Sequence, residues 1–298
     1  KYINRAFMRR VLSTVNGKPI TIGEAHRLAQ NDVMTGAAKE GESDRTQNHL
    51  QYSLLGDPAL SLNFPTMKVV LDSINGIACE RTDTMPKLKA GSIARIAGHI
   101  EGKTDYQGVV TATVRDSREL ITCKLNNTKE ADKAFQFYDR QKTLYQGSDS
   151  VSNGKFSFSF AVPKDINYSD ATGLLNLYSI SNDKTMRAHG TSEKFTVGGS
   201  VESRNDSIGP SIYCYLNSPS FVDGGDVNTT PFFVAKLSDR DGINAAGSGI
   251  GHDLQLVIDG DMTKTYNLND YFTYDFGTYT SGSTYYSIPE LAPGKLQL

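Results

Sequence analysis

Several features that mark common classes of protein are missing from this sequence of 298 residues. It has no stretch of about 18 or more consecutive apolar residues, so we expect no membrane-spanning helix. It has no basic excess either: 31 lysines and arginines against 33 acidic residues leave a net charge of -2, and we expect no nucleic-acid partner. The hydrophobic share of 38% and the charged share of 21% predict a folded chain.

Neither end of the sequence has the features of a complete precursor. The first residue is Lys1, and a helical pattern follows at once, without an initiator methionine or the charged and apolar regions of a signal peptide. At the other end, Pro293 and Gly294 begin a turn that leads into a strand, and the sequence stops at Leu298. We therefore expect both ends to be cuts within a longer protein.

Cysteine is scarce, with only Cys79, Cys123 and Cys214 in the whole chain. The number is odd and the spacings are wide, which excludes a disulfide framework and a zinc ribbon. Cys79 and Cys123 could meet across a β-sandwich, but a lone cysteine in a strand is more often a small buried hydrophobic residue. Cysteine usage therefore permits export without requiring it.

No complete catalytic constellation is visible. A cysteine nucleophile needs a histidine within hydrogen-bond reach, but all three cysteines lie in β-patterned stretches and the histidines are scattered, without metal-ligand spacing. The histidines are His26, His49, His99, His189 and His252. No serine lies in a Gly-x-Ser-x-Gly turn. We therefore assign no catalytic, cofactor-binding or metal-binding residue, and we expect no cofactor.

Two weaker signals leave alternatives open. The segment Asp239-Arg240-Asp241-Gly242 faintly resembles a calcium loop, but it lacks the remaining ligands, and Asx turns explain its aspartates equally well. Tyrosines near the end of the chain could form a platform that stacks on sugars, or they could pack against one another across strands. These tyrosines are Tyr266, Tyr271, Tyr274, Tyr279, Tyr285 and Tyr286.

Residues 1–66 have a helical pattern. Two apolar stripes recur at helical spacing, Ile3, Phe7 and Val11 in the first and Ala25, Leu28, Ala29 and Val33 in the second. Gly17 and Pro19 end the first helix, and Thr21 to Glu24 predict a capping box at the start of the second, which Gly36 ends. A loop is expected from Lys39 to Asn48. Two such helices cannot bury a core alone, so they must pack on further chain.

From Met67 onward the hydrophobic period changes to two, which is typical of strands. The clearest strand has Phe156, Phe158 and Phe160 alternating with smaller residues, and turn signals such as Asn153-Gly154 separate the runs. Residues 67–198 therefore predict a first immunoglobulin-like β-sandwich.

Residues 199–298 predict a second sandwich behind a polar linker at 199–209. Alternating Ile212, Cys214 and Leu216 begin it, and six runs of strand character follow one another. The runs are 211–216, 231–237, 253–258, 263–267, 270–274 and 284–288. Because an immunoglobulin-like sandwich needs about seven strands, and Lys295 to Leu298 form only a stub, this domain is expected to be truncated. The predicted fold class is mostly β.

Particular motifs in the sequence carry a family resemblance. The stretch Leu54-Leu55-Gly56-Asp57-Pro58-Ala59-Leu60 resembles the closing motif of the gingipain family of cysteine peptidases, and Thr21 to Ala25 resemble its last catalytic-domain helix. Later motifs are similar to the region behind the peptidase domain in the family's sortase-like member of type IX secretion in Bacteroidetes. They are Val162-Pro163-Lys164-Asp165-Ile166, Gly209-Pro210, Tyr215-Leu216-Asn217, Gly249-Ile250-Gly251-His252-Asp253 and Leu256-Val257-Ile258-Asp259-Gly260.

The resemblance implies that residues 1–66 are the end of a caspase-like α/β peptidase domain whose catalytic histidine and cysteine lie before Lys1. No catalytic residue carries over to this chain. The parent protein would be a cysteine endopeptidase that removes C-terminal secretion signals from cargo at the outer membrane and transfers the new carboxyl end to a surface anchor. Its expected partners are the upstream peptidase domain, secreted cargo proteins and outer-membrane secretion components.

A second hypothesis is a free-standing cell-surface protein for adhesion or carbohydrate binding, built from immunoglobulin-like modules. The sequence immediately upstream would separate the two. Strand–loop–His and strand–loop–Cys patterns there would favour the peptidase, whereas further sandwich repeats would favour the adhesin.

Overall fold

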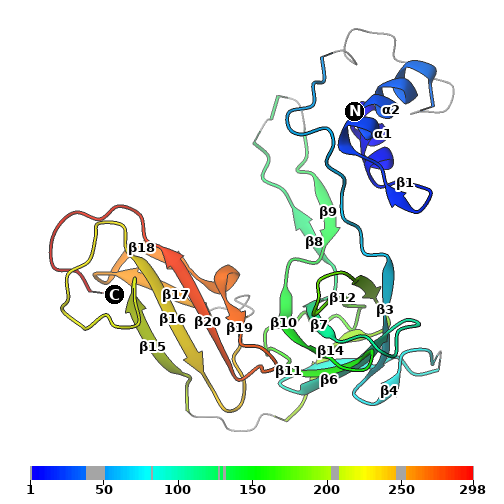
Figure 1. The fold of residues 1–298 in the computed structure, drawn as a ribbon. Helices are drawn as coiled ribbons and strands as arrows, with labels where there is room; N and C mark the ends of the chain where they lie inside the picture. The colour runs from blue at the N-terminus through cyan, green and yellow to red at the C-terminus, as the bar shows by residue number, and fades with distance from the viewer. Residues whose placement is uncertain are drawn as a thin grey trace. The chain divides into compact units, whose positions relative to one another are not determined.

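The chain folds into two compact units, residues 1–65 and 66–298, each treated separately below. The computed structural model describes residues 2–37, 51–81, 83–126, 128–129, 132–202, 208–245 and 253–297. Within these residues the only α-helices are two in the first unit, and the second unit consists of strands and one short 3-10 helix (Figure 1). The prediction of a mostly β chain is confirmed. The predicted loop from Lys39 to Asn48 lies outside the described residues.

The first unit is a pair of helices joined by a tight hairpin. Its elements are α1 (Tyr2–Val11), β1 (Thr14–Val15), β2 (Lys18–Pro19) and α2 (Ile22–Thr35). Asn16 and Gly17 both have positive φ, 52° and 74°, as a two-residue hairpin turn requires. Both predicted helices are confirmed and both bury their apolar stripes. The helical pattern was extended too far, however, because described residues 51–65 contain no helix.

A salt bridge and two small apolar clusters join the helices. The guanidinium of Arg10 donates to both carboxylate oxygens of Asp32, at 2.7 and 2.6 Å. One cluster includes Ile3 and Val33, and the other forms around Ala25 at the hairpin end. Each cluster is small, so this unit has far less core than the second one.

The first turn of α2 is capped from two sides. The Thr21 hydroxyl accepts from the amide of Glu24 at 3.2 Å, as predicted, but the carboxylate of Glu24 is paired with Arg27 instead of completing the capping box. The amides of Ile22 and Gly23 donate to the carbonyls of Leu60 and Pro58, at 2.7 and 2.9 Å. The two motifs of the family resemblance in this unit therefore bind each other, and together they satisfy three of the four free amides at the helix start.

Replacement of Thr21 by alanine is expected to destabilise α2 by about 1 kcal/mol, because the Glu24 amide loses its acceptor. Hydrogen exchange of residues 22–35 should then be about fivefold faster. Thr21→Ser keeps the acceptor and should exchange like the parent chain. Thr14→Ala, at an exposed position of the hairpin, controls for the loss of a threonine. Equal protection in Thr21→Ala and Thr14→Ala would contradict the role of this cap.

The second unit begins with an eight-stranded sheet in which seven strands form one hydrogen-bonded path and the eighth pairs beside it. In spatial order these are β10 (Thr143–Val151), β7 (Gly108–Arg115), β12 (Leu174–Ser181), β13 (Arg187–Ser192), β3 (Met67–Ile74), β6 (Ile93–Ile100) and β11 (Lys155–Ala161), with β4 (Ile77–Ala78) on β3. β3 first pairs parallel with β13, at Met67 and Lys68, and then antiparallel with β6. β3 therefore changes partner and connects two groups of strands.

Two smaller ribbons accompany this sheet. β5 (Lys87–Ala90) pairs parallel with β14 (Thr196–Ser200), and β8 (Glu119–Thr122) pairs antiparallel with β9 (Gln136–Asp139). The main core is lined by alternate residues of the long strands. In β11, Phe156, Phe158 and Phe160 are buried, with exposures of 5%, 5% and 0%, which confirms the strand predicted there.

The rest of the unit is a four-stranded sheet with a separate hairpin. The sheet order is β15 (Ser211–Leu216), β16 (Phe232–Ser238), β20 (Ser281–Ser287) and β19 (Thr273–Tyr274), with the 3-10 helix η2 (Asn269–Tyr271) before β19. The hairpin is β17 (Gln255–Ile258) with β18 (Asp261–Asn267). The predicted stub near the end forms no strand among its described residues, but the Asp259 amide donates to the carbonyl of Gln297 at 2.8 Å and the Gln297 amide donates to the Asp259 carboxylate at 2.7 Å.

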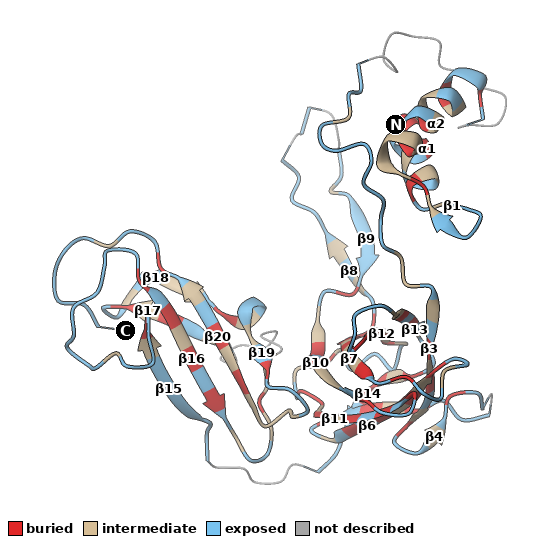
Figure 2. Cartoon of the chain, in the orientation of Figure 1, coloured by how far each residue is buried: buried red, intermediate tan, exposed pale blue. Residues whose placement is uncertain are grey.

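β15 differs from the alternation expected of it. The strand is present, but Ile212 is 60% exposed, Cys214 is exposed, and only Leu216 is buried (Figure 2). β15 is the edge strand of its sheet and pairs with β16 alone. Its apolar residues repeat with the period of a strand, yet no second layer among the described residues covers their face. The hydrophobic period of a strand cannot by itself show whether another layer covers the apolar face of that strand.

Aromatic packing joins the two sheets of this unit. The ring of Tyr145 on β10 lies 4.7 Å from Phe160 and 5.2 Å from Tyr274 on β19, measured between ring centroids. The amide of Gly277 also donates to the carbonyl of Ser148 at 2.9 Å. One apolar cluster runs from Val69 to Ile288 through both sheets. The division of residues 67–298 into two immunoglobulin-like sandwiches, the second of them truncated, stays a prediction.

Candidate functional site

The cysteines do not assemble a nucleophilic site in the described structure. Cys79 is buried, Cys123 and Cys214 are exposed, and all three are free thiols, so Cys79 and Cys123 are not bridged. Burial raises the pKa of the Cys79 thiol, and the positive charge of Lys194 opposes this only in part. A raised pKa keeps a thiol protonated and unreactive near neutral pH. Cys79 is therefore a small core residue.

The described histidines have other partners than the cysteines. A ring nitrogen of His99 lies 2.7 Å from the carboxylate of Asp72, and His26 lies 3.0 Å from the carbonyl of Tyr52. His189 is on β13, and His49 and His252 lie outside the described residues. No histidine–cysteine hydrogen bond occurs in the part of the chain that the structure describes.

The acidic loop after β16 forms a turn. The carboxylate of Asp239 accepts from the amide of Asp241 at 2.8 Å, the Asx-turn bond that was the alternative to calcium binding. Among the described residues no group of three or more potential metal-ligating side chains lies together. The motif from Gly249 to His252 lies outside the described residues.

The late tyrosines range from buried to exposed: Tyr274 is buried, Tyr271 and Tyr285 are exposed, and the other three, Tyr266, Tyr279 and Tyr286, are partly buried against the core. Tyr274 is buried, and its hydroxyl donates to the carbonyl of Ile243 at 2.5 Å, so it serves packing. Tyr271 and Tyr285 are 41% and 49% exposed, with ring centroids 6.1 Å apart. Phe232 extends the group, because its ring is stacked 5.6 Å from that of Tyr285. The sequence left two roles open for these tyrosines, and the structure assigns packing to Tyr274 and exposed ring faces to Tyr271 and Tyr285.

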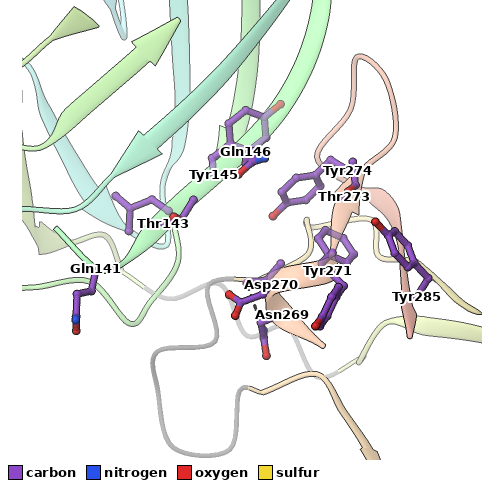
Figure 3. A pocket seen from close by; sticks show the side chains of 13 residues that line it. Gln141, Thr143, Tyr145, Gln146, Asn269, Asp270, Tyr271, Thr273, Tyr274 and Tyr285 are labelled. Carbon is purple, nitrogen blue, oxygen red and sulfur yellow. Dashed lines mark hydrogen bonds between the residues drawn. The ribbon is translucent and has the colours of Figure 1, made fainter. Parts of the chain in front are cut away.

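A cavity of about 370 Å³ lies beside this aromatic group. Figure 3 shows its two sides, with the start of β10 on one and η2, β19 and Tyr285 on the other. Gln141, Thr143 and Gln146 come from the first side, and Asp270 and Tyr271 from the second. Tyr145 and Tyr274 belong to both the cavity and the aromatic contact between the sheets, so the packing of the core also fixes the cavity.

The described residues that line the cavity carry little charge, and several of their polar side chains form no hydrogen bond within the described chain. None of its described lining residues is basic, and Asp270 is its one acid. Within the described chain, no residue forms a hydrogen bond or ion pair with the side chains of Asp270, Gln141 or Gln146. Burial raises the pKa of Tyr145 to about 12, with a further contribution from Asp149, and burial raises the pKa of Tyr274 as well. Both phenols are therefore neutral at physiological pH.

The sequence did not reveal this cavity. Its two sides lie more than a hundred residues apart, at 141–146 and 269–274. Gln141, Thr143 and Gln146 have the composition of any exposed strand, so no local signal marks them. Only the exposed tyrosines were visible beforehand, as the cluster that allowed a sugar platform.

Comparison with protein families and solved structures confirms the class to which the chain is related. Residues 1–63 match the model for peptidase family C25, the gingipain family of cysteine peptidases. The match ends two residues before the first compact unit does, at Pro65. No curated protein sequence matches the chain.

One solved structure that the chain resembles is that of PorU. Over 96% of its length the chain is similar to dimeric latent PorU from Porphyromonas gingivalis, with 32% sequence identity and a TM-score of 0.51. It spans 26% of that PorU chain. Red sea bream transglutaminase is also matched, over 78% of this chain and 28% of its own, but the identity of 7% and TM-score of 0.25 are too low to carry an argument. The resemblance to the gingipain family is thereby confirmed, with similarity to PorU along nearly the whole chain.

Proposed function

We propose that this chain is the non-catalytic C-terminal portion of a gingipain-like cysteine endopeptidase and transpeptidase. The parent removes C-terminal secretion signals from cargo of type IX secretion and acts at the outer membrane or cell surface. The carrying observation is the match of residues 1–63 to peptidase family C25 within a chain similar to PorU throughout. It favours this function over a free-standing adhesin, which would have no reason to contain a segment of a peptidase family.

The surface of the first unit supports a larger peptidase domain. This unit leaves large apolar side chains exposed around its small apolar clusters, as expected of a segment that belongs to a bigger core. These side chains are Met8 and Met34 on the helices, Leu12 just after α1, Val15 on the hairpin, and Leu55 and Leu60 further along, and they are between 47% and 94% exposed. The upstream peptidase domain is the partner that we propose for this surface.

The β portion of the chain would position that domain and contact cargo or outer-membrane secretion components. No helix in the described residues is long and apolar enough to cross a membrane. In this proposal the catalytic cysteine and histidine lie upstream, and Cys79, Cys123 and Cys214 take no part in the reaction.

The test compares the whole parent protein with this chain. Each is incubated with a cargo protein that retains its C-terminal signal, and the products are measured by mass spectrometry. We expect cleavage by the parent and none by the chain alone. In the parent, the double replacement Cys123→Ser and Cys214→Ser, at exposed thiols, should leave cleavage unchanged. Cargo cleavage by the isolated chain, with stoichiometric labelling of one cysteine by a thiol-directed peptidase inhibitor, would overturn the proposal.

A further inference from the structure

The function proposed above assigns no role to the cavity between β10 and β19. Its volume of about 370 Å³ falls within the range of small-molecule pockets, about 300–1,000 Å³. It plays no part in the proposed peptidase role, and the inference below holds whether or not that role is correct.

The aromatic side chains leave part of their ring surface exposed to a ligand. Tyr271 and Tyr285 are 41% and 49% exposed, and both line the cavity. Phe232 is 40% exposed and continues the group along the sheet from Tyr285. Adjacent exposed rings hold apolar area in water, which is unfavourable unless a ligand covers it. The ring face is negative and flat, so it attracts the C–H groups on one face of a sugar ring.

The polar side chains that line the cavity can form hydrogen bonds with the hydroxyl groups of a ligand. Asp270 supplies two acceptor oxygens, Gln141 and Gln146 each supply an acceptor and donors, and Thr143 adds a hydroxyl. Because Asp270 and the two glutamines have no partner within the described chain, they are available to a ligand. A sugar presents alternating hydroxyls that both donate and accept, and a carboxylate accepts from two neighbouring hydroxyls at once.

The charge of the residues that line the cavity further limits the chemical class of ligand that it can bind. A phosphate, sulfate or carboxylate group needs basic partners, and none of the described residues that line the cavity is basic. Asp270 would repel such anions. Two strand edges border the cavity, the nine-residue β10 and the two-residue β19, so strand addition by a peptide is the competing mode of binding that the experiment below also tests.

We propose that this cavity binds a neutral oligosaccharide, with the rings of Tyr271 and Tyr285 stacked on sugar faces and Asp270 accepting hydrogen bonds from sugar hydroxyls. The ligand contacts both sheets of the second unit, since Gln146 lies on β10 and Tyr271 in η2. Binding should therefore also stabilise the contact between Tyr145 and Tyr274 beneath it.

The experiment uses the whole chain and saturation-transfer NMR with defined probes. The neutral probes are maltohexaose, laminarihexaose, cellohexaose, mannohexaose and chitohexaose; a heparin hexasaccharide and a Gly-Ser peptide represent anions and peptides. We expect transfer to at least one neutral oligosaccharide and none to the heparin fragment or the peptide. Tyr271→Ala and Tyr285→Ala should each raise its Kd by about tenfold, the effect of losing one stacked ring.

Two further variants separate binding from folding. Tyr138→Ala removes a tyrosine that is 68% exposed on β9, away from the cavity, and should leave the Kd unchanged. Asp270→Asn keeps the shape of the side chain and should weaken binding by a few fold, because hydrogen bonds to a charged acceptor are about twice as strong. The proposal is overturned if none of the neutral probes binds, if only the heparin fragment or the peptide binds, or if Tyr271→Ala and Tyr138→Ala bind equally well.

Discussion

Replacement of Phe160 by alanine is expected to destabilise residues 66–298 by about 3–5 kcal/mol. The side chain is fully buried, with an exposure of 0%, and its ring lies 4.7 Å from that of Tyr145. Truncation removes apolar contacts and leaves a cavity where β11 meets β10, at the contact that joins the two sheets. Urea unfolding followed by tyrosine fluorescence and circular dichroism measures the loss.

Phe137→Ala serves as the matched control for this replacement. Phe137 is 38% exposed on β9 and stacks only on Phe135, so its loss should cost about 0.5 kcal/mol or less. Similar midpoints for the two variants would show that Phe160 does not hold the core as the structure indicates.

Stability of the same unit is expected to fall steeply between pH 10 and 12. The pKa of Tyr145 is raised to about 12 in the folded state, mainly by burial, against about 10 in the unfolded chain. Because the pKa of this phenol is higher in the folded state, its protonated form stabilises the folded protein. This contribution to the free energy of unfolding is complete below pH 10 and is lost as the pH rises to 12. Two pH units correspond to about 2.7 kcal/mol at most. Burial raises the pKa of Tyr274 too, so it acts in the same direction.

The variant Tyr145→Phe isolates this effect, because it keeps the ring and removes the titrating group. At pH 8 its free energy of unfolding should be close to that of the parent chain. Between pH 8 and pH 12 it should lose about 2 kcal/mol less than the parent. Lysines and exposed tyrosines titrate alike in both proteins, so the difference reports Tyr145 together with the part of the raised Tyr274 pKa that the Tyr145 charge causes. An identical decline in both proteins would contradict the burial of this phenol.

Local patterns predicted those elements whose structure depends on neighbours in sequence. The threonine cap at Thr21, the αL residue Gly36 and the alternation in β11 all follow from a few adjacent residues. The same alternation misled at Ile212 and Cys214, since burial depends on whether another layer covers the strand. The capping partner of Glu24 was also wrong, because Arg27 competes for its carboxylate.

The candidate site could not be predicted from the sequence for a related reason. One side comes from the start of β10, and the other, with the exposed rings and Asp270, comes from η2, β19 and β20, and only the tertiary fold brings them together. The cluster of tyrosines did indicate ring stacking, but which rings are buried depends on the contact with Tyr145. The family resemblance, by contrast, rested on contiguous motifs such as Gly56-Asp57-Pro58, and it was correct.

The Pro58–Leu60 segment makes backbone contacts with α2. The shortest piece of the first unit that can keep α2 in its native form must therefore include this segment. A chain cut after Gly36 would retain both helices but remove the acceptors of the Ile22 and Gly23 amides. Pro58 also packs so close to Gly23 that a methyl group there would come within 2.6 Å of it. Residues 58–61 therefore contribute backbone contacts that stabilise α2. Truncation or domain exchange should therefore be made beyond Ser61, where the backbone no longer bonds to α2.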